Sequence, residues 1–118
     1  MNIACLNYGF DIIEELGIKA IQKHVHTVTD YLYQQLKHLQ HSNGKPVVEI
    51  YGKHELNDET VQGGIVSFNI KHDNGEYIGY YNIQQAAAEK NIHVRTGCHC
   101  NPGACRKYLK QPLNVYEK

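Results

Sequence analysis

The sequence predicts an α+β fold in which helices pack on one face of a small sheet. Two observations support this class. A long amphipathic helical pattern fills the first third of the chain, and short apolar runs bounded by turn residues follow it. Helices that cover one face of a sheet form a two-layer α+β domain. A length of 118 residues suits one small domain.

The most regular pattern is helical and begins at Ile18. Apolar residues recur there every three or four positions, which is the spacing of one helical face. They are Ile18, Ile21, Val25, Val28, Leu32, Leu36 and Leu39. We expect a helix of about twenty residues, ended by the turn sequence at residues 42–44. A shorter helix over residues 8–16 precedes it, and Gly17 separates the two.

Two strands and their turns come next. Residues 46–51 and 64–70 are apolar runs with the length of short strands, and residues 52–60 form a polar loop between them. Asp, Asn and Gly at positions 73–75 are typical of a turn. The segment Gln62-Gly63-Gly64 is interpreted as a turn that enters the second strand, although its glycines also permit a close backbone approach to a ligand.

A third helix and a third strand complete the predicted order. Asn82 could cap a helix that runs to Lys90, with Gln85 reaching back in a capping-box arrangement. The buried face of this helix would be Ile83, Ala86 and Ala87. Residues 92–94 are predicted to form the third strand, which leads into a loop over residues 95–105.

Composition excludes several classes of function. Twelve Lys and Arg balance twelve Asp and Glu, so charge gives no reason to expect a nucleic acid or an anionic membrane as a partner. No apolar run has the roughly 18 residues of a membrane span. Residues 1–8 do not resemble a signal peptide. We therefore expect a cytoplasmic protein whose four cysteines are reduced thiols rather than a disulfide framework.

The segment with the most informative chemistry is the loop at residues 95–105, which holds three of the four cysteines. A cysteine on a mobile, glycine-containing loop can accept a group and carry it elsewhere. The thiolate is the reactive form, and nearby cations favour it. Arg95, His93 and His99 could supply such cations. The fourth cysteine, Cys5, lies between Ala4 and Leu6, and we interpret it as a packing residue.

Two other interpretations of the loop stay open. Cys98, Cys100 and Cys105 have C-x-C-x4-C spacing and could belong to a zinc site. Such a site usually takes four ligands, and only His93 or His99 could complete the set. The three cysteines could also be small buried residues without chemistry, which fits poorly with a loop that contains Gly and Pro. We therefore expect no metal and favour a nucleophilic or sulfur-carrying cysteine.

The loop from Arg95 to Cys105 resembles the cysteine loop of molybdenum cofactor sulfurases. These enzymes are a branch of the NifS-like cysteine desulfurases within the class V aminotransferase family. Further segments fall in the order expected of that branch, at residues 8–11, 43–48, 61–69 and 91–94. The resemblance covers nearly the whole chain. His99 departs from it, since a bulky aromatic residue is expected between the first two cysteines of the loop.

The resemblance implies a pyridoxal-phosphate enzyme that takes sulfur from L-cysteine and leaves alanine. A loop cysteine would accept the sulfur as a persulfide and pass it to the molybdenum cofactor. By motif alignment that carrier is Cys100, five residues after Arg95. Arg95 and His99 would lie near the substrate and favour the thiolate. Cys98 and Cys105 would take part in sulfur relay or in handling the molybdenum cofactor.

The resemblance also implies that residues 1–118 are part of the small, C-terminal domain of a fold-type I pyridoxal-phosphate enzyme. The lysine that holds the cofactor in this family is expected in a large amino-terminal domain, outside this chain. We therefore expect the isolated chain to be inactive and to fold incompletely. A homodimer of the full-length protein is compatible with the resemblance. The remaining alternatives are a general cysteine desulfurase for iron–sulfur assembly and a small zinc-binding interaction module.

Overall fold

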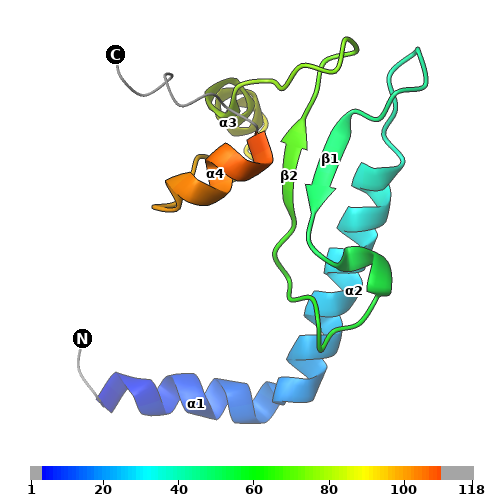
Figure 1. The fold of residues 1–118 in the computed structure, drawn as a ribbon. Helices are drawn as coiled ribbons and strands as arrows, with labels where there is room; N and C mark the ends of the chain where they lie inside the picture. The colour runs from blue at the N-terminus through cyan, green and yellow to red at the C-terminus, as the bar shows by residue number, and fades with distance from the viewer. Residues whose placement is uncertain (1–3, 110–118) are drawn as a thin grey trace. The chain divides into compact units, whose positions relative to one another are not determined.

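The computed structural model describes residues 4–109, and the chain divides into two compact units after Tyr77. The predicted α+β class is confirmed, because the described residues form four α-helices and one two-stranded antiparallel sheet (Figure 1). The elements in chain order are α1 (Ala4–Leu16), α2 (Ile18–Lys37), β1 (Val48–Tyr51), the 3-10 helix η1 (His54–Leu56), β2 (Ser67–Ile70), α3 (Tyr80–Glu89) and α4 (Pro102–Leu109).

The two predicted amino-terminal helices are present, and Gly17 separates them. Gly17 has φ of 78°, a left-handed conformation that glycine adopts without steric cost, and the chain changes direction there (Figure 1). Helix α1 begins at Ala4 rather than at Tyr8, and α2 ends at Lys37, before the predicted turn. That turn still forms, with Gly44 at φ of 76° and its N–H donating to the His41 carbonyl at 2.9 Å.

Strands β1 and β2 are the two predicted strands, each shorter than expected. Val48 faces Ile70 and Ile50 faces Phe68 across the ladder, so these apolar residues share one face of the sheet. Val48 and Ile50 line a cavity together with Tyr33 of α2, which shows that this is the face that α2 covers. The predicted turn at residues 73–75 also forms, with Gly75 at φ of 93°.

The other face of the sheet carries a polar network around Glu49. The Glu49 carboxylate forms an ion pair with Lys71 and accepts a hydrogen bond from the Tyr77 hydroxyl at 2.9 Å. The Lys71 hydrogen bond is the main reason that the pKa of Glu49 lies below its usual value. The hydrogen bond to Glu49 likewise raises the pKa of Tyr77. These contacts fix the strand pair to the segment that follows it.

The core of the first unit is small and centres on one ring pair. Tyr33 of α2 and His54 of η1 are each 7% exposed, and their rings stack at a centroid distance of 5.2 Å. The polar loop predicted at residues 52–60 therefore contains a short helix that brings His54 onto α2. Among the described residues no large side chain is completely buried.

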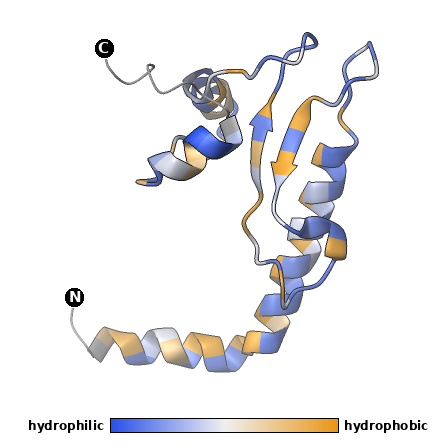
Figure 2. Ribbon diagram, viewed as in Figure 1, coloured by the Kyte–Doolittle hydropathy of each residue, from blue (hydrophilic) through white to orange (hydrophobic). Residues whose placement is uncertain are grey.

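The apolar stripe that predicted α2 is largely exposed in the first unit. Val25, Val28 and Leu32 are 42%, 52% and 44% exposed. The sheet and η1 instead cover a side of α2 that includes Thr29 and Tyr33. Figure 2 shows the resulting alternation of apolar and polar residues along both amino-terminal helices. Helical periodicity identifies an apolar face, but it does not say which partner covers that face.

Gly64 allows the loop before β2 to approach α2 closely. A Cβ atom at this position would lie 2.5 Å from Cγ1 of Val25 and 3.5 Å from Oγ1 of Thr29. The predicted strand-entry turn at residues 62–64 thus has a packing role. The close backbone approach at Gly64 is to a helix of the same unit.

Substitution Gly64→Ala is expected to destabilise the first unit by about 1–3 kcal/mol, because a methyl group there overlaps the stiff, β-branched Val25 side chain. Gly63→Ala is the matched control, since a Cβ there would meet no atom within 4 Å. Urea unfolding of the full-length protein that contains this chain measures the free energy of unfolding of both variants. Val25→Ala should restore part of the loss in the double variant. Equal stability of the two alanine variants would contradict the close approach.

Candidate functional site: the cysteine loop

The cysteine loop is held by helix α3, which ends in a hydrogen-bonded cap. Asn91 has φ of 56°, its N–H donates to the Ala88 carbonyl at 2.9 Å, and the Ile92 N–H donates to the Ala87 carbonyl at 2.9 Å. This pair of bonds is a Schellman motif with Asn in the left-handed position. The cap directs the chain away from the helix into residues 92–96.

Two expectations about this segment were wrong. Helix α3 begins at Tyr80 with Gly79 as its N-cap residue and no side-chain cap bond, so Asn82 lies inside the helix and forms no capping box with Gln85. Residues 92–94 form no strand in the described part of the chain. Ile92 instead completes the α3 cap and is 57% exposed. A strand needs a ladder partner, and within residues 4–109 the sheet consists of β1 and β2.

A tight turn presents Cys100 at the tip of the loop. The Asn101 N–H donates to the Cys98 carbonyl at 2.8 Å, which closes a four-residue turn. Its two central residues, His99 and Cys100, have φ of 47° and 62°. Two positive φ angles are characteristic of a type I′ turn and are uncommon for residues other than glycine. The backbone therefore holds Cys100 in a defined, costly conformation.

Helix α4, which was not predicted, starts immediately after this turn. Asn101 caps it, because its Oδ1 accepts a hydrogen bond from the Ala104 N–H at 3.1 Å, and Pro102 occupies the first helical position. Asn at the N-cap and Pro at the next residue are both strong helix-start signals. The pair Asn101-Pro102 is therefore the sequence signal for α4.

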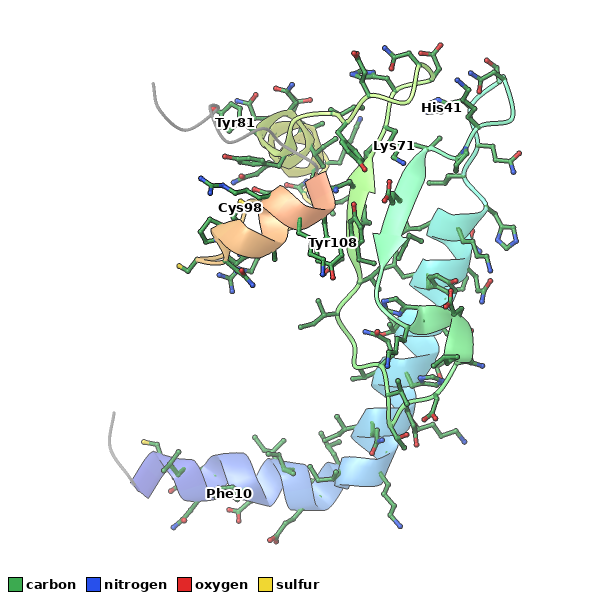
Figure 3. All side chains as sticks on the ribbon, viewed as in Figure 1. Phe10, His41, Lys71, Tyr81, Cys98 and Tyr108 are labelled. Atoms are coloured by element: carbon green, nitrogen blue, oxygen red, sulfur yellow. A yellow bond between two sulfur atoms is a disulfide. The ribbon has the colours of Figure 1, made fainter. Side chains whose placement is uncertain are left out.

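The three loop cysteines are in two different states. Cys98 and Cys105 form a disulfide with a Cα–Cα distance of 5.7 Å, and Figure 3 shows Cys98 beside α4. Cys100, which lies between them in sequence, is free and exposed. The expectation that all four cysteines are thiols was therefore wrong for this pair. Cysteine spacing predicts neither whether two thiols meet nor how they are oriented.

The fourth cysteine also differs from expectation. Cys5 is free and exposed on α1 rather than packed in a core. An apolar neighbourhood in sequence indicates burial only where another element covers that face. Cys5 is therefore a free, exposed thiol outside the loop.

The predicted cationic residues lie on the same unit as the loop. His99 is adjacent to Cys100 in the turn, and both are exposed. Arg95 and His93 are exposed on the segment that leads from α3 to the turn. The Thr96 hydroxyl donates to Oε1 of Gln84 at 2.7 Å, a contact not foreseen from the sequence. This bond anchors the loop to α3 between Arg95 and the turn.

Residues 4–109 contain neither a metal-binding cluster of side chains nor a helix that could span a membrane. No group of three or more His, Cys, Asp or Glu side chains within this range is arranged to hold a metal ion. The disulfide also occupies two of the three sulfur atoms that the zinc interpretation needs. In the same range, no helix combines the length and apolar character needed to cross a membrane.

The chain belongs to the class V aminotransferase family, since the model of that family, "Aminotransferase class-V", matches residues 1–116. Within it, the predicted resemblance to molybdenum cofactor sulfurases is confirmed. The chain is 41% identical over 111 residues to "Molybdenum cofactor sulfurase" of Bos taurus, covering 92% of the chain and 13% of the relative. It is 43% identical over 111 residues to the Homo sapiens protein of that name, and this match covers 92% of the chain and 12% of the relative.

The similarity extends to insects and plants. The chain is 48% identical over 92 residues to the Drosophila ananassae sulfurase, covering 78% of the chain and 12% of that relative. Across the relatives compared, from Oryza sativa to Aedes aegypti, the chain spans 12% to 15% of their length. No solved structure matches the chain.

Proposed function

We propose that this chain is the persulfide-bearing part of a molybdenum cofactor sulfurase. The full-length protein would take sulfur from L-cysteine with the help of pyridoxal phosphate, leave alanine, and deliver the sulfur to the molybdenum cofactor. The observation that carries the proposal is the state of the loop. In a chain similar to sulfurases over 92% of its length, Cys100 is a free, exposed thiol at the tip of a turn.

Cys100 would act as the nucleophile toward the substrate. Its thiolate attacks the sulfur of L-cysteine, the Cys100 Sγ–S bond forms, and the substrate C–S bond breaks. The electron pair of the broken bond stays with the carbon that becomes the methyl group of alanine. An exposed position on a turn gives Cys100 the access that this step requires. Arg95 and His99 would favour the thiolate through their charge.

A cavity of the first unit is a poor match for pyridoxal phosphate. This cavity measures about 220 Å³, and Lys37 and Glu55 are among the residues that line it. A phosphate group is normally held by several N–H donors or cations, and Glu55 would repel it. We therefore assign the cofactor to parts of the full-length protein outside this chain. This agrees with a small-domain portion of a fold-type I enzyme.

The proposal includes a cytoplasmic location and allows a homodimer of the full-length protein. A general cysteine desulfurase for iron–sulfur assembly would use the same loop cysteine. No contact in the structure favours that alternative, whereas the names of the relatives favour the sulfurase.

The experiment that tests the proposal compares the isolated chain with the full-length protein. Each is supplied with pyridoxal phosphate and L-cysteine, and alanine is measured. We expect alanine only from the full-length protein, with borohydride fixing the cofactor to a lysine outside residues 1–118. The full-length protein should also restore sulfur-dependent activity to a desulfo molybdenum enzyme. Fixation at one specific lysine of the isolated chain, or no alanine from the full-length protein, would contradict the proposal.

A further inference from the structure

The disulfide of the loop surrounds the candidate sulfur carrier in sequence. Cys98 and Cys105 are bonded to each other, are seven residues apart, and flank the free Cys100. Both bonded cysteines are half-buried, whereas Cys100 is exposed. In the cytoplasm, which is the proposed location, a disulfide is more often catalytic or redox-sensing than structural. The Cys98–Cys105 pair is therefore a candidate for a redox role.

Backbone hydrogen bonds also connect the two bonded cysteines. The Asn101 N–H donates to the Cys98 carbonyl at 2.8 Å, and the Cys105 N–H donates to the Asn101 carbonyl at 3.3 Å. The Asn101 side chain also caps α4 through the Ala104 N–H at 3.1 Å. Asn101 thus links the backbone of one cysteine to that of the other. Cys98 and Cys100 lie in one turn, and Cys105 lies in the helix that follows it.

The electron count of sulfur delivery gives this dithiol a task. The outer sulfur of a persulfide is a sulfane sulfur, whereas a metal takes a terminal sulfur ligand as sulfide, which is more reduced by two electrons. A dithiol that becomes a disulfide releases two electrons. In its reduced state the loop would contain one such dithiol, Cys98 and Cys105, for the one carrier thiol, Cys100. Oxidation of this dithiol releases the two electrons that the reduction of one carried sulfur requires.

We propose that Cys98 and Cys105 form a redox pair that reduces the sulfur carried by Cys100 to sulfide for delivery to the acceptor. This inference rests on the proposed function, since it requires a persulfide on Cys100. It deepens that function by assigning the pair a reductive step. The observed combination of a Cys98–Cys105 disulfide and a free Cys100 is the state in which the loop ends after one delivery.

The step balances in two exchanges. The Cys98 thiolate attacks the outer sulfur of the Cys100 persulfide, forming a persulfide on Cys98 and leaving Cys100 as thiolate. The Cys105 thiolate then attacks Sγ of Cys98. The Cys98–Cys105 bond forms, the bond from Cys98 to the carried sulfur breaks, and hydrosulfide leaves with that electron pair. The protons lost by the two thiols are regained by Cys100 and the sulfide. A small thiol or dithiol reductant outside the protein restores the pair.

The test uses the full-length protein after reduction with dithiothreitol and removal of the reductant under anaerobic conditions. One equivalent of L-cysteine is added, or Cys100 is loaded with inorganic polysulfide and the excess is removed. Released sulfide and the Cys98–Cys105 linked peptide are then quantified. The wild-type protein should release one sulfide for each linked peptide formed. Cys105→Ser should retain a persulfide on Cys98 or Cys100 and lose sulfide release, and Cys5→Ser should behave as wild type.

Three results would overturn the inference. They are sulfide release from Cys105→Ser at the wild-type rate, sulfide release without the linked peptide, and a Cys98–Cys105 bond that dithiothreitol does not reduce in the native protein. Failure of the proposed function is distinguishable from these results. In that case L-cysteine gives no persulfide, while the polysulfide-loaded protein still reports whether the pair reduces the carried sulfur.

Discussion

The substitution Cys100→Ser in the full-length protein is expected to abolish persulfide formation, with sulfur transfer falling roughly 10³-fold or more because a serine hydroxyl cannot carry the sulfur. Cys100 is the loop cysteine that is both free and exposed, and the turn closed by the Asn101 N–H and the Cys98 carbonyl presents it. Transfer to a desulfo molybdenum enzyme is the readout, and unchanged binding of pyridoxal phosphate shows that the variant is folded.

Three matched serine variants define what is specific to Cys100. Cys5→Ser removes another free, exposed thiol and should have no effect. Cys98→Ser and Cys105→Ser should still allow the persulfide to form on Cys100 and should lose the later delivery of sulfide. Wild-type transfer by Cys100→Ser would remove Cys100 from the proposed role, whatever the other variants do.

The isolated chain is expected to show no cooperative unfolding transition. Among residues 4–109 the buried side chains are those of one ring pair, Tyr33 and His54, at 7% exposure each, whereas ordering the backbone costs about 1–2 kcal/mol per residue. On α1, Tyr8, Phe10 and Leu16 are 71%, 59% and 58% exposed. So much exposed apolar surface leaves too little hydrophobic stabilisation to offset that entropy.

Urea titration followed by far-ultraviolet circular dichroism measures this property. The isolated chain should lose its helical signal gradually, and the full-length protein should lose it in a sigmoidal transition. A single sigmoidal transition in the monomeric chain would show that residues 1–118 fold independently.

The elements that sequence predicted well are those whose signals are local. Helix α2 follows from apolar spacing, the break at Gly17 from the freedom of glycine, and the turn at residues 73–75 from its residue types. The strand pair followed from two β-branched runs, although both strands are shorter than expected. Such signals depend on neighbours in the chain and need no knowledge of what lies across the fold.

The errors have non-local or competing causes. The pattern at residues 92–94 was interpreted as a strand, but Asn91 places Ile92 in a helix cap, a competing local signal. The covered side of α2 depends on β1 and η1, which no helical periodicity describes. The pairing of Cys98 with Cys105 depends on where Asn101 starts α4. The loop motif identifies Cys100 as the candidate carrier. It does not show that Cys100 is a free thiol while Cys98 and Cys105 form a disulfide.

The most direct test of the central proposal is to locate the sulfur in the wild-type full-length protein. The protein, with pyridoxal phosphate bound and the Cys98–Cys105 pair left oxidised, is mixed with sulfur-labelled L-cysteine for a single turnover, alkylated and mapped by peptide mass spectrometry. The oxidised pair cannot remove the label, so it should accumulate as a persulfide on Cys100. Label on another cysteine, or alanine release without any labelled cysteine in residues 95–105, would contradict the assignment of this loop as the sulfur carrier.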